Sequence, residues 1–231
     1  MVSPTTRGRS QRRSGPLRAL FGTAFLAVAA AAPLRAQWRL EAWLGQAWSA
    51  SSPVSFTQFN QPEIRVNGQW ATRPFAPTWY YAGRIAKWSG GAAWAFEYMH
   101  HKIYLENPPP GVQLFQVTNG VNFILGERLW RRHGWEFGIG AGPLYAVPVS
   151  SVRGLVYDNA HGIFHSQYEL AGAALQANAA RRLRLLPYTF GSLSVKGTAG
   201  YLHVHIANGH AVTSNFALHI QYGLSLQSRP K

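Results

Sequence analysis

The chain has 231 residues, no cysteine, and 22 lysines and arginines against eight acidic residues. This length is enough for one domain, and the absence of cysteine excludes a scaffold held by disulfides. Charged residues make up only 13% of the chain, and aromatic residues make up another 13%. Together with alternating strands, such a composition is typical of a protein that crosses the outer membrane as a β-barrel.

Residues 1–36 have the order of a secretory signal peptide. Arginines at five positions between 7 and 18 form a basic region, and the 16 residues 19–34 carry no charge. This apolar run is shorter than the roughly 20 residues that a membrane helix needs, and an uncleaved anchor is the alternative. Ala36 supplies a small residue before a cleavage site at Gln37. We therefore predict a signal peptide over 1–36 and an outer-membrane β-barrel domain over 37–231.

The predicted mature chain keeps 16 basic residues and all eight acids, a net charge of +8. Export argues against a nucleic-acid partner, so the positive charge favours an anionic membrane surface. We expect a monomer whose partners are outer-membrane lipids. Nothing in the sequence identifies a cofactor.

The clearest strand pattern lies near the end of the chain, over residues 216–227. Six apolar side chains alternate there with six small or polar ones without an error. Twelve residues exceed most soluble strands and suit a tilted strand that crosses a membrane. The apolar face is Phe216, Leu218, Ile220, Tyr222, Leu224 and Leu226.

Similar alternation recurs along the chain, separated by short and long connections in turn. Short turns on one side and long loops on the other match outer-membrane barrels, in which the short turns are periplasmic. We therefore predict an all-β fold, an eight-stranded antiparallel transmembrane β-barrel; an exported soluble sandwich is the alternative. The expected strands are 38–48, 79–88, 92–105, 121–130, 135–142, 168–183, 188–207 and 216–227, and the expected long loops are 49–78, 106–120, 153–167 and 208–215.

Three segments carry a motif: EYMHHKIY at residues 97–104, TNGVN at 118–122 and YELAGAALQ at 168–176. They resemble, in the same order, the segments EFTHxKVY, TDGxN and YELxGxAxQ of a family of small outer-membrane barrels related to lipid A oxidase. Asn119 replaces the family's usual aspartate, which weakens any acid role at that position.

The resemblance implies oxygen-dependent oxidation of the proximal glucosamine of lipid A, but it assigns no catalytic residue. A non-enzymatic structural or adhesive barrel of the OmpA/OmpW type and a narrow channel are the alternatives, because a fold does not decide function. If the chain is an enzyme, the candidate catalytic residues are Glu97, His100, Lys102, Tyr104, Asn119, Asn122, Glu169 and Gln176.

Strand parity separates these candidates into two faces. Glu97 is expected to point into the lumen, where a buried charge needs a partner; the predicted lumen ion pairs involve Arg84, Glu97, Glu136 and Lys196. His100, Lys102 and Tyr104 continue the lipid-facing side of their strand. These residues predict either a belt of side chains at the level of the lipid headgroups or a lateral glycolipid site. In the second case the Lys102 ammonium would bind a phosphate of the glycolipid.

Two further sets of residues complete the predictions. Lipid headgroups are expected to contact Lys102, Arg131, Arg132, Arg181 and Arg182. His203 and His205 share one strand face and could direct two imidazoles to one metal, although no cysteine or dense carboxylate set supports such a site.

Overall fold

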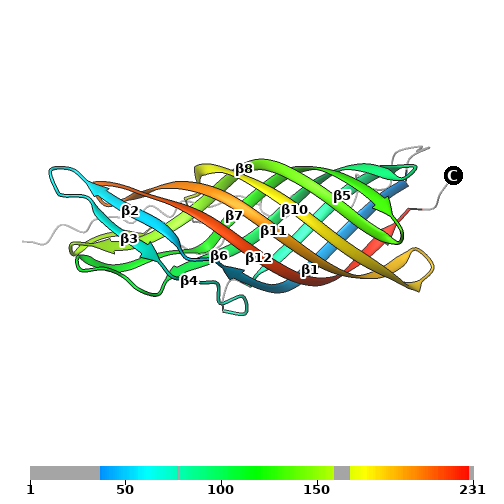
Figure 1. Ribbon diagram of the computed structural model, residues 1–231, viewed down its shortest axis with the longest axis horizontal. Coiled ribbons are helices and arrows are strands. Elements are labelled where there is room, and N and C mark those ends of the chain that lie inside the picture. The colour runs from blue at the N-terminus through cyan, green and yellow to red at the C-terminus, as the bar shows by residue number, and fades with distance from the viewer. Residues whose placement is uncertain (1–36, 77–78, 159–166, 229–231) are drawn as a thin grey trace, which may run out of the picture. The chain divides into compact units, whose positions relative to one another are not determined.

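The computed structural model describes residues 37–76, 79–158 and 167–228, so the predicted signal peptide lies outside the described residues. Eight long antiparallel strands form a sheet that closes because β12 pairs back onto β1 (Figure 1). No helix among the described residues is long and apolar enough to cross a membrane. In sheet order the strands are β1 (Gln37–Ser49), β5 (Tyr81–Ser89), β6 (Ala92–Leu105), β7 (Val112–Arg132), β8 (Trp135–Val152), β10 (Glu169–Leu186), β11 (Thr189–Ile206) and β12 (Gly209–Gln227).

The predicted eight-stranded barrel is therefore confirmed, and β12 shows why its sequence alternates. Leu218, Tyr222 and Leu226 are each about half exposed on the outer surface. His219 and Gln221, between them in sequence, are fully buried in the interior. Successive side chains of a strand point to opposite faces, so one face contacts lipid and the other fills the lumen.

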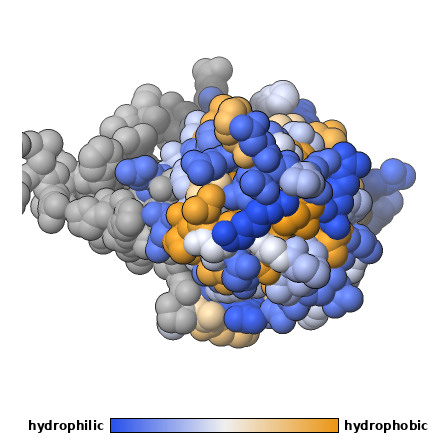
Figure 2. All heavy atoms as spheres, turned by 90° about the vertical axis from the view of Figure 1, so that its left-hand side faces the viewer, coloured by the Kyte–Doolittle hydropathy of each residue, from blue (hydrophilic) through white to orange (hydrophobic). Residues whose placement is uncertain are grey.

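Three of the predicted long loops were placed wrongly, because much of their length is strand. Strands β2 (Ser52–Gln58) and β3 (Ile64–Gly68) form a hairpin that adds to β12, and β12 itself begins at Gly209 rather than at Phe216. Strand β7 begins at Val112, well inside the predicted loop over 106–120. Two short strands, β4 (Trp70–Ala71) and β9 (Leu155–Asp158), pair with β6 and β8. The sheet thus continues past the length that a membrane requires, and Figure 2 views that end of the barrel.

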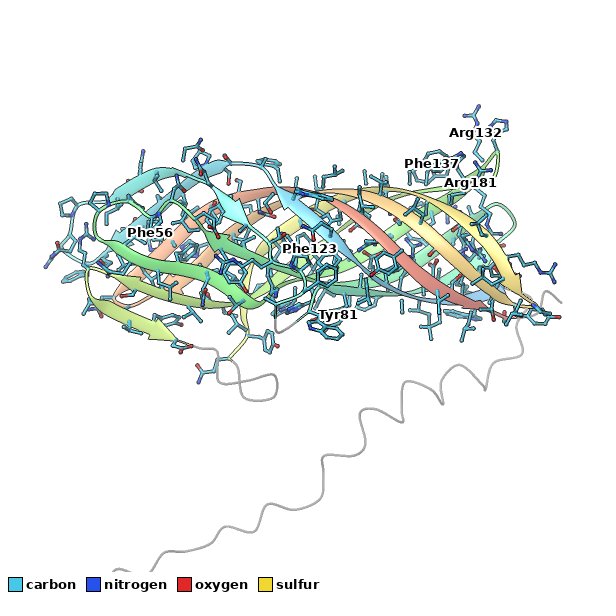
Figure 3. All side chains as sticks on the ribbon, turned by 90° about the horizontal axis from the view of Figure 1, so that it is seen from below. Phe56, Tyr81, Phe123, Arg132, Phe137 and Arg181 are labelled. Atoms are coloured by element: carbon cyan, nitrogen blue, oxygen red, sulfur yellow. The ribbon has the colours of Figure 1, made fainter. Side chains whose placement is uncertain are left out.

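The interior of the barrel has two regions of different chemistry. Toward the end that carries β2 and β3, it holds a cluster of buried apolar side chains, in which the Phe56 and Phe115 rings meet edge to face at 5.1 Å. Phe56 and Phe123 mark this cluster in Figure 3. Toward the end with the short turns, buried charged side chains lie beside a small apolar cluster that includes Trp88 and Leu129. Each large apolar side chain in the first region stabilises the fold by about 1.5–3 kcal/mol relative to exposure.

Candidate functional sites

An ionic network fills the inner part of the lumen. Arg84 lies at its centre, with its Nε 2.7 Å from Glu41 Oε2 and its Nη1 3.1 Å from Glu127 Oε2 and 3.7 Å from Glu97 Oε2. Lys196 Nζ donates to Glu97 Oε1 from the far side of the barrel. All of these side chains are almost fully buried. The two cations face three carboxylates, and Arg39, 3.2 Å from Glu41, supplies the third positive charge; pairing of this kind is the condition under which buried ions are tolerated.

A second group of charges lies at the mouth of the same lumen, at the end with the short turns. Arg39 Nη1 and Nη2 donate to the two oxygens of Glu136 at 2.7 and 2.6 Å. Arg131 Nε and Arg182 Nη1 reach the same carboxylate at 2.9 and 3.2 Å. Arg39 Nε also lies 3.2 Å from Glu41, so this group joins the first. Arg39, Glu41 and Glu127 are absent from the predicted lumen ion pairs, although strand alternation puts Arg39 and Glu41 on the polar face of β1.

The structure does not bring all of the predicted catalytic residues to one place. Glu97 and Gln176 lie in the lumen, where the Gln176 amide donates to Glu127. Glu169 lies outside the barrel, 2.6 Å from His205 Nδ1. His100 and Asn122 lie on the outer face of the neighbouring strands β6 and β7. Of Asn119, only the backbone is described.

The outer-face candidates form a compact polar cluster. His100 and Asn122 are direct cross-strand partners, with His100 Nδ1 2.9 Å from Asn122 Oδ1. The Tyr98 hydroxyl donates to the same oxygen at 2.6 Å, and the ring of Tyr81 stacks on His100 with 5.2 Å between centroids. Figure 3 labels Tyr81 on the outside of the barrel. Two of the segments that carry the family resemblance, 97–104 and 118–122, therefore meet at this point.

Gly120 allows the two strands to approach at this cluster. Its φ is +106°, and a Cβ there would collide with the imidazole of His100 and the amide of Asn122. We expect Gly120→Ala to lower the free energy of unfolding by about 1–3 kcal/mol, because it adds both backbone strain and a clash. Gly197→Ala is the matched control, since nothing lies within 4 Å of that position. Equal urea midpoints for the two variants in detergent micelles would contradict the role given to Gly120.

Lys102 is not an exposed headgroup ligand, which corrects the prediction. Its side chain is buried, and its Nζ donates to the carbonyl oxygen of Ala76 at 2.7 Å. The segment that contains Ala76 follows β4, which pairs with the outer end of β6. Tyr104 is partly covered in the same way, with the Arg73 guanidinium 4.6 Å from its ring centroid. Strand parity correctly predicted an outward direction, but a distant part of the chain covers this face.

The four predicted headgroup arginines divide into two pairs. Arg131 and Arg182 turn toward the lumen mouth and bind Glu136, so they do not form part of an outer girdle. Arg132 and Arg181 are exposed at the short-turn end (Figure 3). Three cross-strand cation–π pairs lie on the outer face near that end. The distances from the cationic group to the ring centroid are 5.8 Å for Lys87 over Trp38, 5.1 Å for Arg128 over Trp94 and 5.6 Å for Arg181 over Trp135.

The histidines proposed for a metal do not assemble a ligand set. The rings of His203 and His205 are 6.5 Å apart, and His203 lies closer to His210, with 4.7 Å between centroids. Among the residues that the structure describes, no group of three or more histidines, cysteines or carboxylates could hold a metal ion.

A closed antiparallel barrel with an apolar outer face, aromatic side chains at its edge and a charged, filled lumen defines the class of outer-membrane β-barrels. The sequence matches no protein-family model and no curated protein. Its fold is similar to that of two small barrels of known structure. Neisserial surface protein A is 8% identical, with 84% of this chain and 97% of that chain covered and a TM-score of 0.38. Ail, the attachment invasion locus protein of Yersinia pestis, is 7% identical, with 82% and 99% covered and a TM-score of 0.35.

Proposed function

We propose that this chain is a non-enzymatic outer-membrane barrel whose extracellular end is a rigid binding surface. The observation that carries the proposal is the way the hairpin tips at that end are bound to one another. Arg153 Nη1 donates to Gln58 Oε1 at 2.9 Å, and its Nη2 donates to the carbonyl oxygen of Pro62 at 2.6 Å. Backbone hydrogen bonds join Phe59 to Asn208 and Arg153 to Gly111. Four separate turns are thereby fixed in one arrangement.

Large apolar side chains are exposed on the surface that these hydrogen-bonded turns form. Phe59 is 81% exposed and Val156 is 69% exposed, with Leu155 beside it at 43%. Figure 2 shows hydrophobic residues among hydrophilic ones on this end of the barrel. An exposed aromatic side chain on a preorganised surface is the arrangement that supplies most of the energy of protein–protein contacts. We therefore define the tip surface as Phe59, Leu155 and Val156.

The charges around the tip surface favour a partner that is bound through apolar contacts. Arg65 Nε donates to Glu63 at 2.7 Å, and this hydrogen bond holds the pKa of the Glu63 carboxyl below its usual range. Arg73 Nη2 lies 2.7 Å from Glu106 Oε1. Because Arg65 and Arg73 have acidic partners and Arg153 donates to Gln58 and Pro62, these guanidinium groups are already engaged and offer little to a polyanion. The lumen beneath it is filled with side chains, which weighs against the channel alternative.

We expect Phe59→Ala to reduce adhesion of bacteria that display this chain by about tenfold or more, as for loss of a central aromatic contact. Adhesion would be counted on a panel of immobilised extracellular proteins. Phe75→Ala is the control, because Phe75 is also exposed, at 65%, but lies outside the tip surface. Equal adhesion with and without the chain, or equal loss in both variants, would contradict the proposal.

A second candidate function is the binding or oxidation of lipid A at the outer-face cluster of Tyr81, Tyr98, His100 and Asn122. It is favoured by one observation, namely that two segments resembling lipid A oxidase place His100 and Asn122 side by side. Mass spectrometry of lipid A from cells with and without the chain tests it. An oxidised sugar that disappears in His100→Ala would support this function over the first; identical lipid A in all three strains would exclude the oxidation.

A further inference from the structure

A pocket of about 370 Å³ opens at the short-turn end of the barrel. This volume is within the range of sites that hold small ligands. Four arginines and a single glutamate line it, so its charge is +3 when His133 is neutral. The lining residues that carry charge are Arg131, Arg132, Arg182, Arg184 and Glu136.

The single carboxylate of this pocket is shared by too many cations to neutralise them. Arg39 donates hydrogen bonds to both oxygens of Glu136 from the lumen side, at 2.7 and 2.6 Å. Arg131 and Arg182 reach it at 2.9 and 3.2 Å from the pocket side. Arg132 and Arg184 add two further charges at the pocket wall. A group of guanidiniums that faces one carboxylate favours the entry of another anion.

The two inner guanidiniums are also held in fixed positions. Arg131 stacks on Trp88 and Arg182 stacks on Phe190, each 3.9 Å from the ring centroid. Arg182 Nη2 donates to Gln227 Oε1 at 3.0 Å, while Arg182 Nε is buried without a hydrogen-bond partner. An orphaned buried donor destabilises the folded chain, and an anion would satisfy it. Stacked guanidiniums lose little freedom when they bind an oxyanion.

We propose that this mouth pocket binds a phosphate-bearing anion. A guanidinium presents its donors as a planar fork that matches the oxygens of a phosphate, and several forks converge here. The phosphate can come from an anionic phospholipid of the inner leaflet or from a soluble phosphate of the periplasm. This site is separate from the tip surface, which lies at the other end of the barrel.

The test measures binding to the purified, folded chain in detergent by isothermal titration calorimetry. The probes are inorganic phosphate, glycerol phosphate and short-chain phosphatidylglycerol, with chloride as the monovalent comparison. We expect Arg182→Gln and Arg184→Gln each to weaken phosphate binding at least about tenfold, as for loss of a charge-assisted contact. Arg128→Gln is the matched control, because Arg128 lies near the same end but faces outward over Trp94.

Each outcome decides one point. Tighter binding of phosphatidylglycerol than of glycerol phosphate identifies the lipid as the source, and equal binding identifies soluble phosphate; either result supports the pocket. Equal weakening by Arg128→Gln and Arg184→Gln would mean a diffuse basic surface and would overturn the proposal. So would phosphate binding no stronger than that of chloride. Arg184→Gln keeps the test valid if Arg182→Gln fails to fold, since Arg184 is exposed.

Discussion

Replacing Lys196 by methionine is expected to lower the free energy of unfolding by about 3–5 kcal/mol, the cost of leaving a buried carboxylate without its partner. Lys196 and Glu97 are both fully buried and form an ion pair across the lumen. Arg84 cannot replace Lys196, because it lies 3.7 Å from Glu97 and already binds Glu41 and Glu127. The measurement is urea-induced unfolding in lipid vesicles, followed by tryptophan fluorescence.

The double variant Glu97→Gln with Lys196→Met provides the internal control for this effect. Because it removes both charges, it is expected to recover much of the lost stability, so the two changes will not be additive. Lys87→Met is the external control, since Lys87 is exposed on the outer face. An equal cost for Lys196→Met and Lys87→Met, or additive costs in the double variant, would show that Glu97 and Lys196 are not coupled.

An arginine in place of Ile220 is expected to destabilise the barrel by about 2–4 kcal/mol when the chain is folded into a bilayer. Ile220 lies on the outer face of β12, midway along the run of exposed apolar residues from Phe216 to Leu226. A guanidinium there would have to enter the hydrocarbon near the middle of the membrane.

Val156→Arg is the comparison for Ile220→Arg. Val156 is more exposed than Ile220, at 69% against 40%, but it lies on β9 beyond the membrane. We therefore expect its replacement to change stability by less than about 1 kcal/mol, as for a site outside the hydrocarbon. If both arginines cost the same in vesicles, the outer face of β12 does not contact lipid.

The sequence predicted the strands well because alternation is a local property. In β12 successive side chains face lipid and the lumen in turn, so neighbouring residues alone show which face is which. The interior position of Glu97 followed from the same rule. The extension by β2 carries the same signal, since Val54 and Phe56 alternate with Ser55 and Thr57. That signal was overlooked because a long connection was expected at this position.

Not every contact across the lumen could be predicted in the same way. Glu97 and Lys196 both belong to the predicted lumen ion pairs although they are 99 residues apart, whereas Arg39, 97 residues from Glu136, does not. Which of them meet depends on the stagger with which the strands close the barrel. The cover over Lys102 was missed because it comes from Ala76, 26 residues earlier, in a segment that was predicted to be a loop.

The prediction for the arginines at the short-turn end contains a different kind of error. Arg182 has the same strand parity as Gln176 and Asn178, both of which point into the lumen. The prediction instead assigned it by its position next to a turn, where side chains were expected to reach headgroups. Parity alone would have separated Arg182 from Arg181.

The most direct test of a membrane-spanning barrel with an extracellular tip uses single cysteines, because the chain contains none of its own. Gln61→Cys lies at the β2–β3 turn, Arg132→Cys at the β7–β8 turn and Ile220→Cys on the outer face of β12. Intact cells would be treated with a membrane-impermeant maleimide. We predict that the cysteine at position 61 is labelled, that the one at 132 is labelled only after the outer membrane is opened, and that the one at 220 is not labelled in either case. Labelling at 132 on intact cells, or at 220 in the folded chain, would contradict the account.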